Sequence, residues 1–353
     1  MRILRHPAEI TPPYRGGVVV LGNFDGLHRG HQVVIGEAGR LARAMNAPFT
    51  VFVTEPHPRQ FFQPGAPPFR LTPFRDRVRL MQGFSPDLLL ALPFDQELAA
   101  THHADFVRGI LLDHLGARHL VVGFDYRFGQ ARGGSVETLA WMGAMEGFGL
   151  TVVPPVRFGI EGAAGEVYSS SLVRAALKEG KARRAAALLG HWWSVSGHVI
   201  AGDRRGRELG FPTVNILLPS ESIRPRHGVY AVRLLIEEAH GSGDESAVFE
   251  GVANFGRRPT VATAGELLEV HLFDFNGDLY GRHVRVEFVG FIRPERRFEG
   301  LEALKSQIVE DATAARLLLA DPENRRDHLP PLTLEGYLCE HPEPPVQLIH
   351  HDG

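Results

Sequence analysis

The first half of the sequence alternates short, continuous apolar runs with longer segments of helical spacing. Short apolar runs between helical segments are typical of strands that are buried on both faces. They favour a parallel sheet that is covered by helices on both sides. The runs are residues 18–21, 49–53, 88–92, 119–122 and 150–153. Ligands of such sheets bind beyond the carboxyl ends of the strands, so the loops after Leu21, Val53 and Val122 are expected to carry the chemistry.

The character of the sequence changes after Gly190. Strand-like alternation follows, without comparable helices between the strands, so this half is expected to form a small antiparallel barrel. The strand-like runs are residues 195–200, 229–236, 249–253, 267–273 and 283–291. Asn276 and Gly277 lie between the last two runs and predict a tight hairpin. A helix is expected over residues 301–319.

These patterns divide the 353 residues into two domains and a tail. We expect an α/β Rossmann-like domain over residues 1–186. An antiparallel β-barrel domain with a C-terminal helix is expected over residues 187–325. Residues 326–353 are rich in proline, glutamate and histidine, which predicts a flexible tail.

Bulk properties argue against several classes of function. The formal net charge of −3 gives no basic footprint for nucleic acid. The apolar runs are too short to span a bilayer, and the N-terminus has no apolar core typical of a secretory signal. The single cysteine, Cys339, can form no disulfide within the chain, which fits a reducing compartment. We expect a cytoplasmic protein that binds neither nucleic acid nor membranes, and the sequence leaves a homo-oligomer open.

The loop after the first apolar run reads GNFDGLHRGH over residues 22–31. Its glycines allow a tight turn close to a ligand, and the following helix offers free N–H groups to phosphate. His28 and His31 are close enough to act on one ligand, where two imidazoles can donate hydrogen bonds as charge develops on phosphate oxygens. The alternatives are a plain strand–helix turn with surface histidines and a zinc site completed by Asp25 and His57.

Three further segments stand where ligands are expected to bind. The PHP string at residues 56–58 gives a stiff loop. The GFDYRFG string at residues 123–129 combines aromatic faces with a carboxylate and a guanidinium. The SSSLVR string at residues 169–174 begins a helix whose N–H groups and arginine could bind ATP phosphates. The structural alternatives are a packed aromatic loop and an ordinary helix cap.

A second group of motifs lies in the barrel half. A glycine-rich loop with Gly202, Gly206 and Gly210 runs into the string FPTVN. It is not a Walker A loop, because no Gly-Lys-Ser/Thr follows. Thr213 and Asn215 are two residues apart, so on a strand both side chains point to one face. Their oxygens, together with ATP phosphates and water, suit Mg²⁺, although an isolated pair of this kind would be interpreted as a turn.

Glu269 is a carboxylate in the otherwise apolar strand-like run LEVHLF. One interpretation is an outward-facing residue on an amphipathic strand. The other is a general base for a substrate hydroxyl that is held near ATP.

Taken together and in this order, GNFDGLHRGH, PHP, GFDYRFG and SSSLVR resemble the N-terminal half of the bacterial bifunctional riboflavin kinase/FAD synthetases, which belong to the H-x-G-H nucleotidyltransferases. The resemblance implies adenylyl transfer from ATP to FMN, giving FAD and pyrophosphate. It implies that His28 and His31 are catalytic and stabilise the α-phosphate in the transition state. The implied ATP-binding residues are Gly22, Phe24, Ser170 and Arg174, and the implied flavin-binding residues are Pro56, His57 and Asp125. Ser135 is a departure, because an aspartate is common at that position in the family.

The strings FPTVN, GVANFGRRPT, LEVHLF and FIRPE resemble the riboflavin kinase module of the same family. The resemblance implies phosphorylation of riboflavin by Mg-ATP, with Thr213 and Asn215 as metal ligands and the three glycines of the preceding loop around the phosphates. Glu269 would be the base on the ribityl 5′-hydroxyl. Asn254 and Arg293 are expected to contact the flavin.

The expected ligands are therefore riboflavin, FMN, FAD and ATP, with ATP as co-substrate and Mg²⁺ as cofactor. One rival interpretation is a single-function nucleotidyltransferase whose second half only binds a ligand. The intact FPTVN string and Glu269 argue against it. Another rival is a non-catalytic flavin carrier, which predicts eroded phosphate motifs, and the four main strings are unbroken.

Overall fold

The computed structural model describes residues 1–158, 165–200, 211–236, 247–257 and 266–343. Two compact units divide the chain. The first comprises Met1–Pro67, Phe74–Ser169 and the segment from Pro331 onward. The second comprises Pro68–Pro73 and Ser170–Pro330. In the described part of the chain, no helix combines the length and the apolar composition needed to cross a bilayer.

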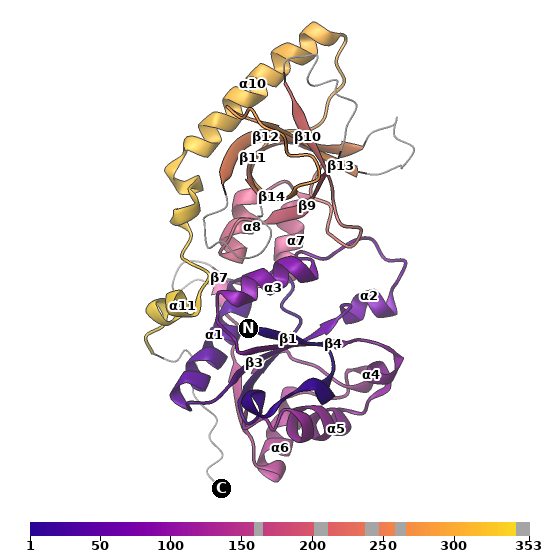
Figure 1. Cartoon of the computed structure of the whole chain (residues 1–353), viewed down its shortest axis with the longest axis vertical. Helices are drawn as coiled ribbons and strands as arrows, with labels where there is room; N and C mark the ends of the chain where they lie inside the picture. Colours follow the sequence, from indigo (N-terminus) through magenta and orange to yellow (C-terminus); the bar gives the residue numbers. More distant parts are fainter. Residues whose placement is uncertain (159–164, 201–210, 237–246, 258–265, 344–353) are drawn as a thin grey trace. The chain divides into compact units, whose positions relative to one another are not determined.

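The first unit is built on a six-stranded parallel sheet (Figure 1), as the alternating pattern predicts. The strands, in sheet order, are β1 (Arg2–Leu4), β4 (Leu88–Pro93), β3 (Phe49–Glu55), β2 (Val18–Leu21), β5 (His119–Gly123) and β6 (Gly149–Val153). Five of them are the five predicted apolar runs. The sixth, β1, escaped prediction because three residues carry too little pattern, and it is held by pairing with β4.

Helices cover both faces of this sheet. Val18 and Val20 of β2 pack toward helices α1 (Arg29–Ala44) and α3 (Phe74–Gln82). Val19 and Leu21 point the other way, toward the π-helix η3 (Phe106–His114) and α6 (Val136–Glu146). Shorter elements are η1 (Pro7–Glu9), η2 (Pro12–Tyr14), α2 (Pro58–Phe62), α4 (Gln96–Ala100), α5 (His103–Asp105), η4 (Gln130–Arg132) and the two-stranded sheet β7 (Arg157–Phe158) and β8 (Glu166–Val167).

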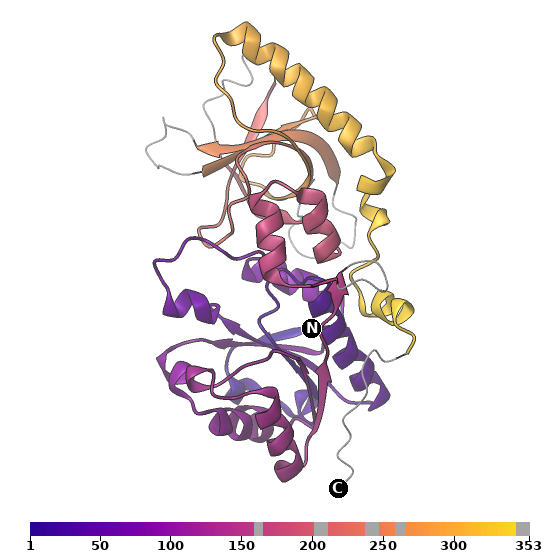
Figure 2. The ribbon, with the colours of Figure 1, turned by 180° about the vertical axis from the view of Figure 1, so that it is seen from behind.

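The second unit is a closed antiparallel barrel, again as predicted. Its strands, in order around the barrel, are β10 (Thr213–Leu217), β13 (Glu266–Leu272), β12 (Val248–Arg257), β11 (Gly228–Ile236), β14 (His283–Arg293) and β9 (Ser194–Ile200). The expected C-terminal helix, α10 (Leu301–Ala320), packs against β11, β12 and β14. Helices α7 (Ser170–Lys178) and α8 (Ala182–Leu189) lie side by side next to the barrel (Figure 2).

The hairpin predicted at Asn276 and Gly277 is wrong. Strands β13 and β14 are not neighbours, because β12 and β11 lie between them in the barrel. The left-handed backbone of this connection occurs at Asp274 and Gly281 instead. The pairing of these strands is set by closure of the barrel, which a turn dipeptide does not report.

The boundaries of the units differ from those expected from composition. Helices α7 and α8 belong with the barrel, so the second unit begins at Ser170 instead of residue 187. The C-terminal segment, expected to be a flexible tail, contains η5 (Pro322–Asn324), η6 (Arg326–His328) and α11 (Leu334–Glu340). Helix α11 is packed in the first unit, because Leu334 and Tyr337 are buried in its core.

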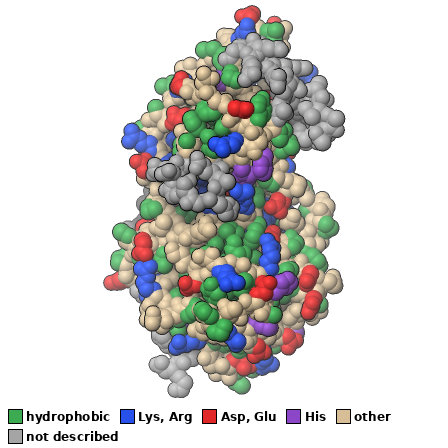
Figure 3. Space-filling view, in the orientation of Figure 1, with side chains coloured by type: hydrophobic (Ala, Val, Ile, Leu, Met, Phe, Trp, Pro, Cys, Tyr) green, Lys and Arg blue, Asp and Glu red, His purple; other side chains and the backbone are tan. Residues whose placement is uncertain are grey.

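Acidic and basic side chains are interspersed over the described residues of the face drawn in Figure 3.

A six-residue strap from the first half of the sequence, Pro68–Pro73, is part of the second unit. Its Arg70 exchanges backbone hydrogen bonds with Glu221 and Ile223, at 3.0 and 2.8 Å. The carbonyl of Leu71, which is 1% exposed, accepts a hydrogen bond from the Trp193 indole at 2.9 Å. Long-range contacts of this kind leave no mark in the local sequence pattern.

The two adjacent tryptophans allow the contribution of this hydrogen bond to stability to be measured. Trp193→Phe leaves the buried Leu71 carbonyl without its donor, which costs about 1–3 kcal/mol. Trp192→Phe is the matched control, because the Trp192 indole N–H is buried and has no partner among the described residues. We expect calorimetry to show a larger drop in the unfolding temperature of the second unit for Trp193→Phe. Equal drops would mean that the hydrogen bond to the strap contributes nothing.

Candidate active sites

Strand β2 marks the switch point of the parallel sheet. It pairs with β3 on one edge and with β5 on the other. The chain leaves β2 into α1 on one face, and after β5 it continues into α6 on the other face. At such a point the loops beyond the carboxyl ends of the two strands diverge and leave a crevice for ligands. The GNFDGLHRGH loop and the GFDYRFG loop are these two loops.

The backbone between β2 and α1 is held in an uncommon conformation. Phe24, Gly26 and Leu27 have φ values of 50°, 86° and 45°. For non-glycine residues this region costs about 1–3 kcal/mol each and persists only where the surroundings impose it. Burial of the Phe24 and Leu27 side chains in the core beneath α1 supplies that constraint. A Cβ at Gly22 would lie 2.7 Å from the Phe24 ring, so only glycine lets the ring lie against the strand end.

His28 and His31 are brought together as predicted. Their rings stack with centroids 3.6 Å apart, and the Phe24 ring packs edge-on against His31 at 5.4 Å. His28 caps α1, because its Nδ1 accepts a hydrogen bond from the backbone N–H of His31 at 3.3 Å. In a neutral imidazole an accepting Nδ1 leaves the proton on Nε2, which can then donate to a ligand. The positive end of the α1 dipole adds to the attraction for an anion.

An apolar cavity of about 510 Å³ opens beside this loop. Six Phe and Tyr side chains contribute to its walls, and Tyr126 and Phe128 stack at 5.7 Å in its lining. Burial raises the pKa of the Tyr126 phenol above its ordinary value. The aromatic lining consists of Phe52, Phe62, Phe94, Phe106, Tyr126 and Phe128. Such walls suit a flat aromatic ligand.

Of the other residues expected in this site, some line the cavity and others do not. Gly22 and His57 line the cavity, and His57 caps α2. Pro56 and Asp125 are exposed and are not among the lining residues, so their contact with flavin stays a prediction. Phe24 supports His31 instead of facing the cavity.

Ser170 and Arg174 lie in α7 of the second unit. The Arg174 Nε donates to the carbonyl of Phe69 in the strap at 2.8 Å, and its guanidinium lies 5.5 Å from the Phe69 ring. Arg174 therefore has a structural contact in its own unit, and ATP binding by these two residues stays a prediction.

Sequence reasoning missed the residues that hold the loop in place. Arg77 of α3 is fully buried and forms an ion pair with Glu55, at the end of β3. Its Nη1 also donates to the carbonyl of Asn23 at 2.6 Å. Thr54 donates to the Asn23 side chain at 3.1 Å. Since these partners come from three separate elements, no local motif could have indicated them.

The second site lies on the outer face of the barrel beneath α10. A cavity of about 700 Å³ is lined by four of the expected residues, Thr213, Asn254, Glu269 and Arg293. The strand register explains their meeting. Asn215 of β10 and Asn254 of β12 both pair directly with Glu269 of β13, so the three form one row across three strands.

Neighbouring contacts fix the walls of this second cavity. Arg293 forms a two-pronged ion pair with Asp311 of α10, at 2.8 and 2.7 Å. A bidentate arginine–carboxylate pair of this kind is rigid, because both ends are planar. His271 Nδ1 lies 2.9 Å from the carbonyl of Pro212, just before β10. The residues Gly202, Gly206 and Gly210 lie outside the described part of the chain.

The oxygen-bearing side chains at the start of β10 fit a magnesium ion. Asn215 is 4% exposed, and its Oδ1 has no hydrogen-bond partner among the described residues. Thr213 lies two residues before Asn215 on the same face, and Glu269 is the register partner of Asn215. Oxygen ligands of this kind, completed by phosphates and water, are what Mg²⁺ prefers. Among the described residues no group of three His, Cys, Asp or Glu gathers that could hold a metal ion.

Comparison with known proteins matches the two halves of the chain to two different family models. The family model described as FAD synthetase matches residues 11–166, and the one described as riboflavin kinase matches residues 189–319. A bifunctional riboflavin kinase/FMN adenylyltransferase of Escherichia coli is 40% identical over 317 residues, covering 90% of this chain and 97% of that protein. The chain belongs to this family. The resemblance inferred from the motifs, and with it the two transferase activities, is confirmed at the level of the family.

Two further relatives match over a similar share of the chain. The enzyme of the same name from Pseudomonas fluorescens is 39% identical, and the match covers 92% of this chain and all of that protein. A crystal structure described as a macrolide-efflux protein from Streptococcus pneumoniae is 29% identical and has a TM-score of 0.76. That match covers 89% of this chain and 98% of the other.

The strained loop before α1 gives a prediction about the first site. Gly22→Ala places a methyl group against the Phe24 ring, which must shift and carry His31 with it. A displacement of about 1 Å in a catalytic group can cost about 10²-fold in rate. Gly109→Ala in η3 is the matched control, because nothing lies within 4 Å of its added Cβ. We expect only Gly22→Ala to slow FAD formation from FMN. An unimpaired Gly22→Ala enzyme would show that the ring packing does not position the histidine.

Proposed function

We propose that this chain makes FAD from riboflavin in two ATP-dependent steps, each at its own site. One observation carries the proposal. Two cavities lie in two separate units, and each is formed or flanked by the residues of one motif group. Riboflavin is phosphorylated in the barrel unit, and the resulting FMN is adenylylated in the parallel-sheet unit.

In the first step the ribityl 5′-oxygen of riboflavin attacks the γ-phosphorus of ATP, and the bond to the β-phosphate oxygen breaks to release ADP. Glu269 takes the hydroxyl proton. Its position in the centre of the row with Asn215 and Asn254, in the lining of the barrel cavity, supports this role. Thr213 and Asn215 would hold Mg²⁺, which would offset negative charge on the ATP phosphates. Asn254 and Arg293 orient the flavin.

In the second step a phosphate oxygen of FMN attacks the α-phosphorus of ATP, and pyrophosphate leaves. The nucleophile is already anionic, so the site has to stabilise charge instead of removing a proton. His28, His31 and the first N–H groups of α1 donate hydrogen bonds to the α-phosphate oxygens. The aromatic cavity beside Gly22 holds the flat ring of FMN. A cytoplasmic location stays a prediction from the sequence.

His31→Ala tests the second step. Loss of one donor to the developing charge typically costs about 10²–10³ in rate. The variant is expected to lose most FAD formation while it still makes FMN from riboflavin at the parent rate. His114→Ala, at an exposed position of η3, is the control and should leave both activities intact. Chromatographic separation of the flavins measures both products. Equal loss of both activities in a folded His31→Ala protein would contradict the assignment.

Glu269→Gln tests the first step. A positioned general base contributes about 10²–10⁴ in rate, and glutamine keeps the size of the side chain but cannot take the proton. We expect FMN formation from riboflavin to slow, with little change in KM and with normal conversion of supplied FMN to FAD. Thr213→Ala should instead raise the Mg-ATP concentration required. Glu310→Gln, on the exposed side of α10, is the control. A parent rate of FMN formation in Glu269→Gln would exclude Glu269 as the base.

A further inference from the structure

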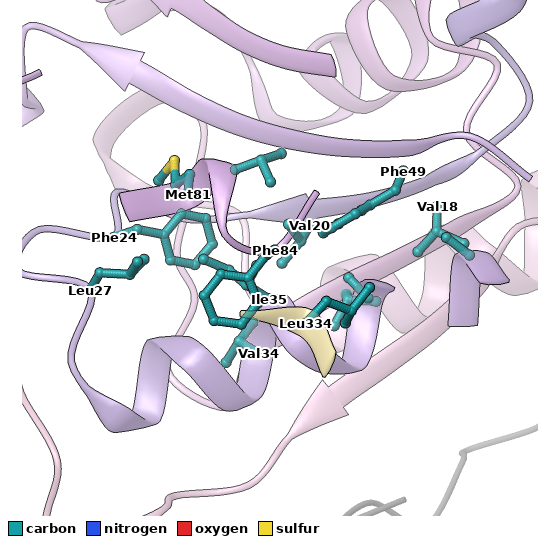
Figure 4. Packing of buried hydrophobic residues seen from close by; sticks show 14 of the residues in the cluster. Val18, Val20, Phe24, Leu27, Val34, Ile35, Phe49, Met81, Phe84 and Leu334 are labelled. Atoms are coloured by element: carbon teal, nitrogen blue, oxygen red, sulfur yellow. The ribbon is translucent and has the colours of Figure 1, made fainter. Parts of the chain in front are cut away.

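The C-terminal helix α11 lies beyond the two matched family models, the second of which ends at residue 319. It is nevertheless part of the core of the first unit. Leu334 and Tyr337 are 5% and 4% exposed, and they share one buried cluster with Phe24 and Leu27 of the loop before α1. Figure 4 shows Leu334 beside the α1 residues Val34 and Ile35 in this cluster.

The contact is made possible by two glycines on one face of α1. Gly36 and Gly39 are three residues apart, so they lie one above the other on the helix surface. A Cβ at Gly36 would lie 2.3 Å from Cγ of Tyr337, and one at Gly39 would lie 2.8 Å from Cδ1 of Leu334. The Tyr337 ring and the Leu334 side chain therefore occupy the space that larger residues on α1 would fill.

Polar contacts fix the register between the two helices. Arg43 near the end of α1 pairs with Glu335 at 2.7 Å, and Arg29 at its start pairs with Glu340 at 3.2 Å. Exposed pairs of this kind add little stability, but together they set the direction in which α11 runs along α1. The Leu334 N–H also donates to the carbonyl of Gly83, just after α3, at 3.0 Å.

One end of this contact reaches the catalytic histidines. Arg29 directly follows His28, the residue that caps α1 and stacks on His31. The next residue, Gly30, is crowded as well. A Cβ there would lie 3.2 Å from the His28 ring and 3.3 Å from Cβ of Tyr168. The position of the first turn of α1 thus sets the position of both imidazoles, and α11 holds α1 along most of its length.

We propose that α11 is a positioning element for adenylyl transfer and that Tyr337 is its central positioning residue. By filling the glycine face of α1, the Tyr337 ring fixes the helix whose first turn presents His28 and His31 to the α-phosphate of ATP. The activity readout of this inference rests on the proposed function. The segment acts only on the second step, because it is packed in the core of the unit that carries the adenylyl-transfer site.

The test compares the full chain with Tyr337→Ala, Tyr337→Phe and a chain that ends at Pro330. Tyr337→Ala and the shortened chain are expected to lower kcat for FAD formation from FMN by about 10-fold or more, since small displacements of catalytic groups are costly. KM for FMN and the rate of FMN formation from riboflavin should stay near the parent values. Tyr337→Phe keeps the ring and should behave like the parent.

Two further measurements separate positioning from a general loss of folding. A synthetic peptide of residues 331–343 should restore FAD formation to the shortened chain, whereas the same peptide carrying Tyr337→Ala should not. Amide hydrogen exchange should become faster in the first turns of α1 in Tyr337→Ala and in the shortened chain, while strands β2 and β3 stay protected. In the shortened chain the peptide should reverse this change. Exchange that rises equally over the whole sheet, or parent kcat in the shortened chain, would overturn the proposal. If the parent itself makes no FAD, the proposed function fails, and the exchange pattern with its reversal by the peptide still decides the role of α11.

Discussion

The four residues of β2 are the constraint on which the adenylyl-transfer unit depends. Val18–Leu21 are at most 1% exposed, and they pair with β3 on one edge and β5 on the other. Because the strand is enclosed on both edges and both faces, its end is fixed in space. The chain must then turn sharply into α1, and the buried Phe24 and Leu27 side chains hold that turn in a conformation that costs free energy. Arg77, which forms an ion pair with Glu55, also donates a hydrogen bond to the carbonyl of Asn23 and so fixes the start of the turn.

The barrel site depends on register in the same way that the first site depends on a strand end. Asn215, Glu269 and Asn254 are 54 and 15 residues apart along the chain, and only antiparallel pairing of β10, β13 and β12 brings them into one row. A slip of one residue in β13 would turn Glu269 toward the barrel interior, where Leu268 and Val270 are fully buried. The core of the barrel therefore protects the position of the Glu269 carboxylate, because a slip would bury a charge and expose leucine.

What could be predicted from the sequence was local. Apolar runs gave five of the six parallel strands, and continuous strings such as GNFDGLHRGH located His28 and His31 beside each other. Contacts between distant segments could not be read in this way. The strap at Pro68–Pro73, the Arg77 ion pair and the packing of α11 on α1 each join segments whose local patterns are unremarkable. The hairpin prediction at Asn276 and Gly277 was wrong for the same reason. Closure of the barrel determines the partners of β13 and β14, and a turn dipeptide gives no information about closure.

The different chemistry of the two sites follows from the two nucleophiles. A ribityl hydroxyl stays protonated at neutral pH, so the kinase site needs a base, and it has a carboxylate centred among polar side chains. The phosphate of FMN has a second pKa of about 6 and is already charged at pH 7, so a base would gain nothing there. Its attack on the anionic α-phosphate of ATP instead brings negative charges together. That step calls for hydrogen-bond donors and a helix N-terminus, and the loop after β2 supplies both in His28, His31 and the first turn of α1. A single site could not meet both needs, because a carboxylate placed beside the α-phosphate would repel the charge that the adenylyl-transfer site has to stabilise.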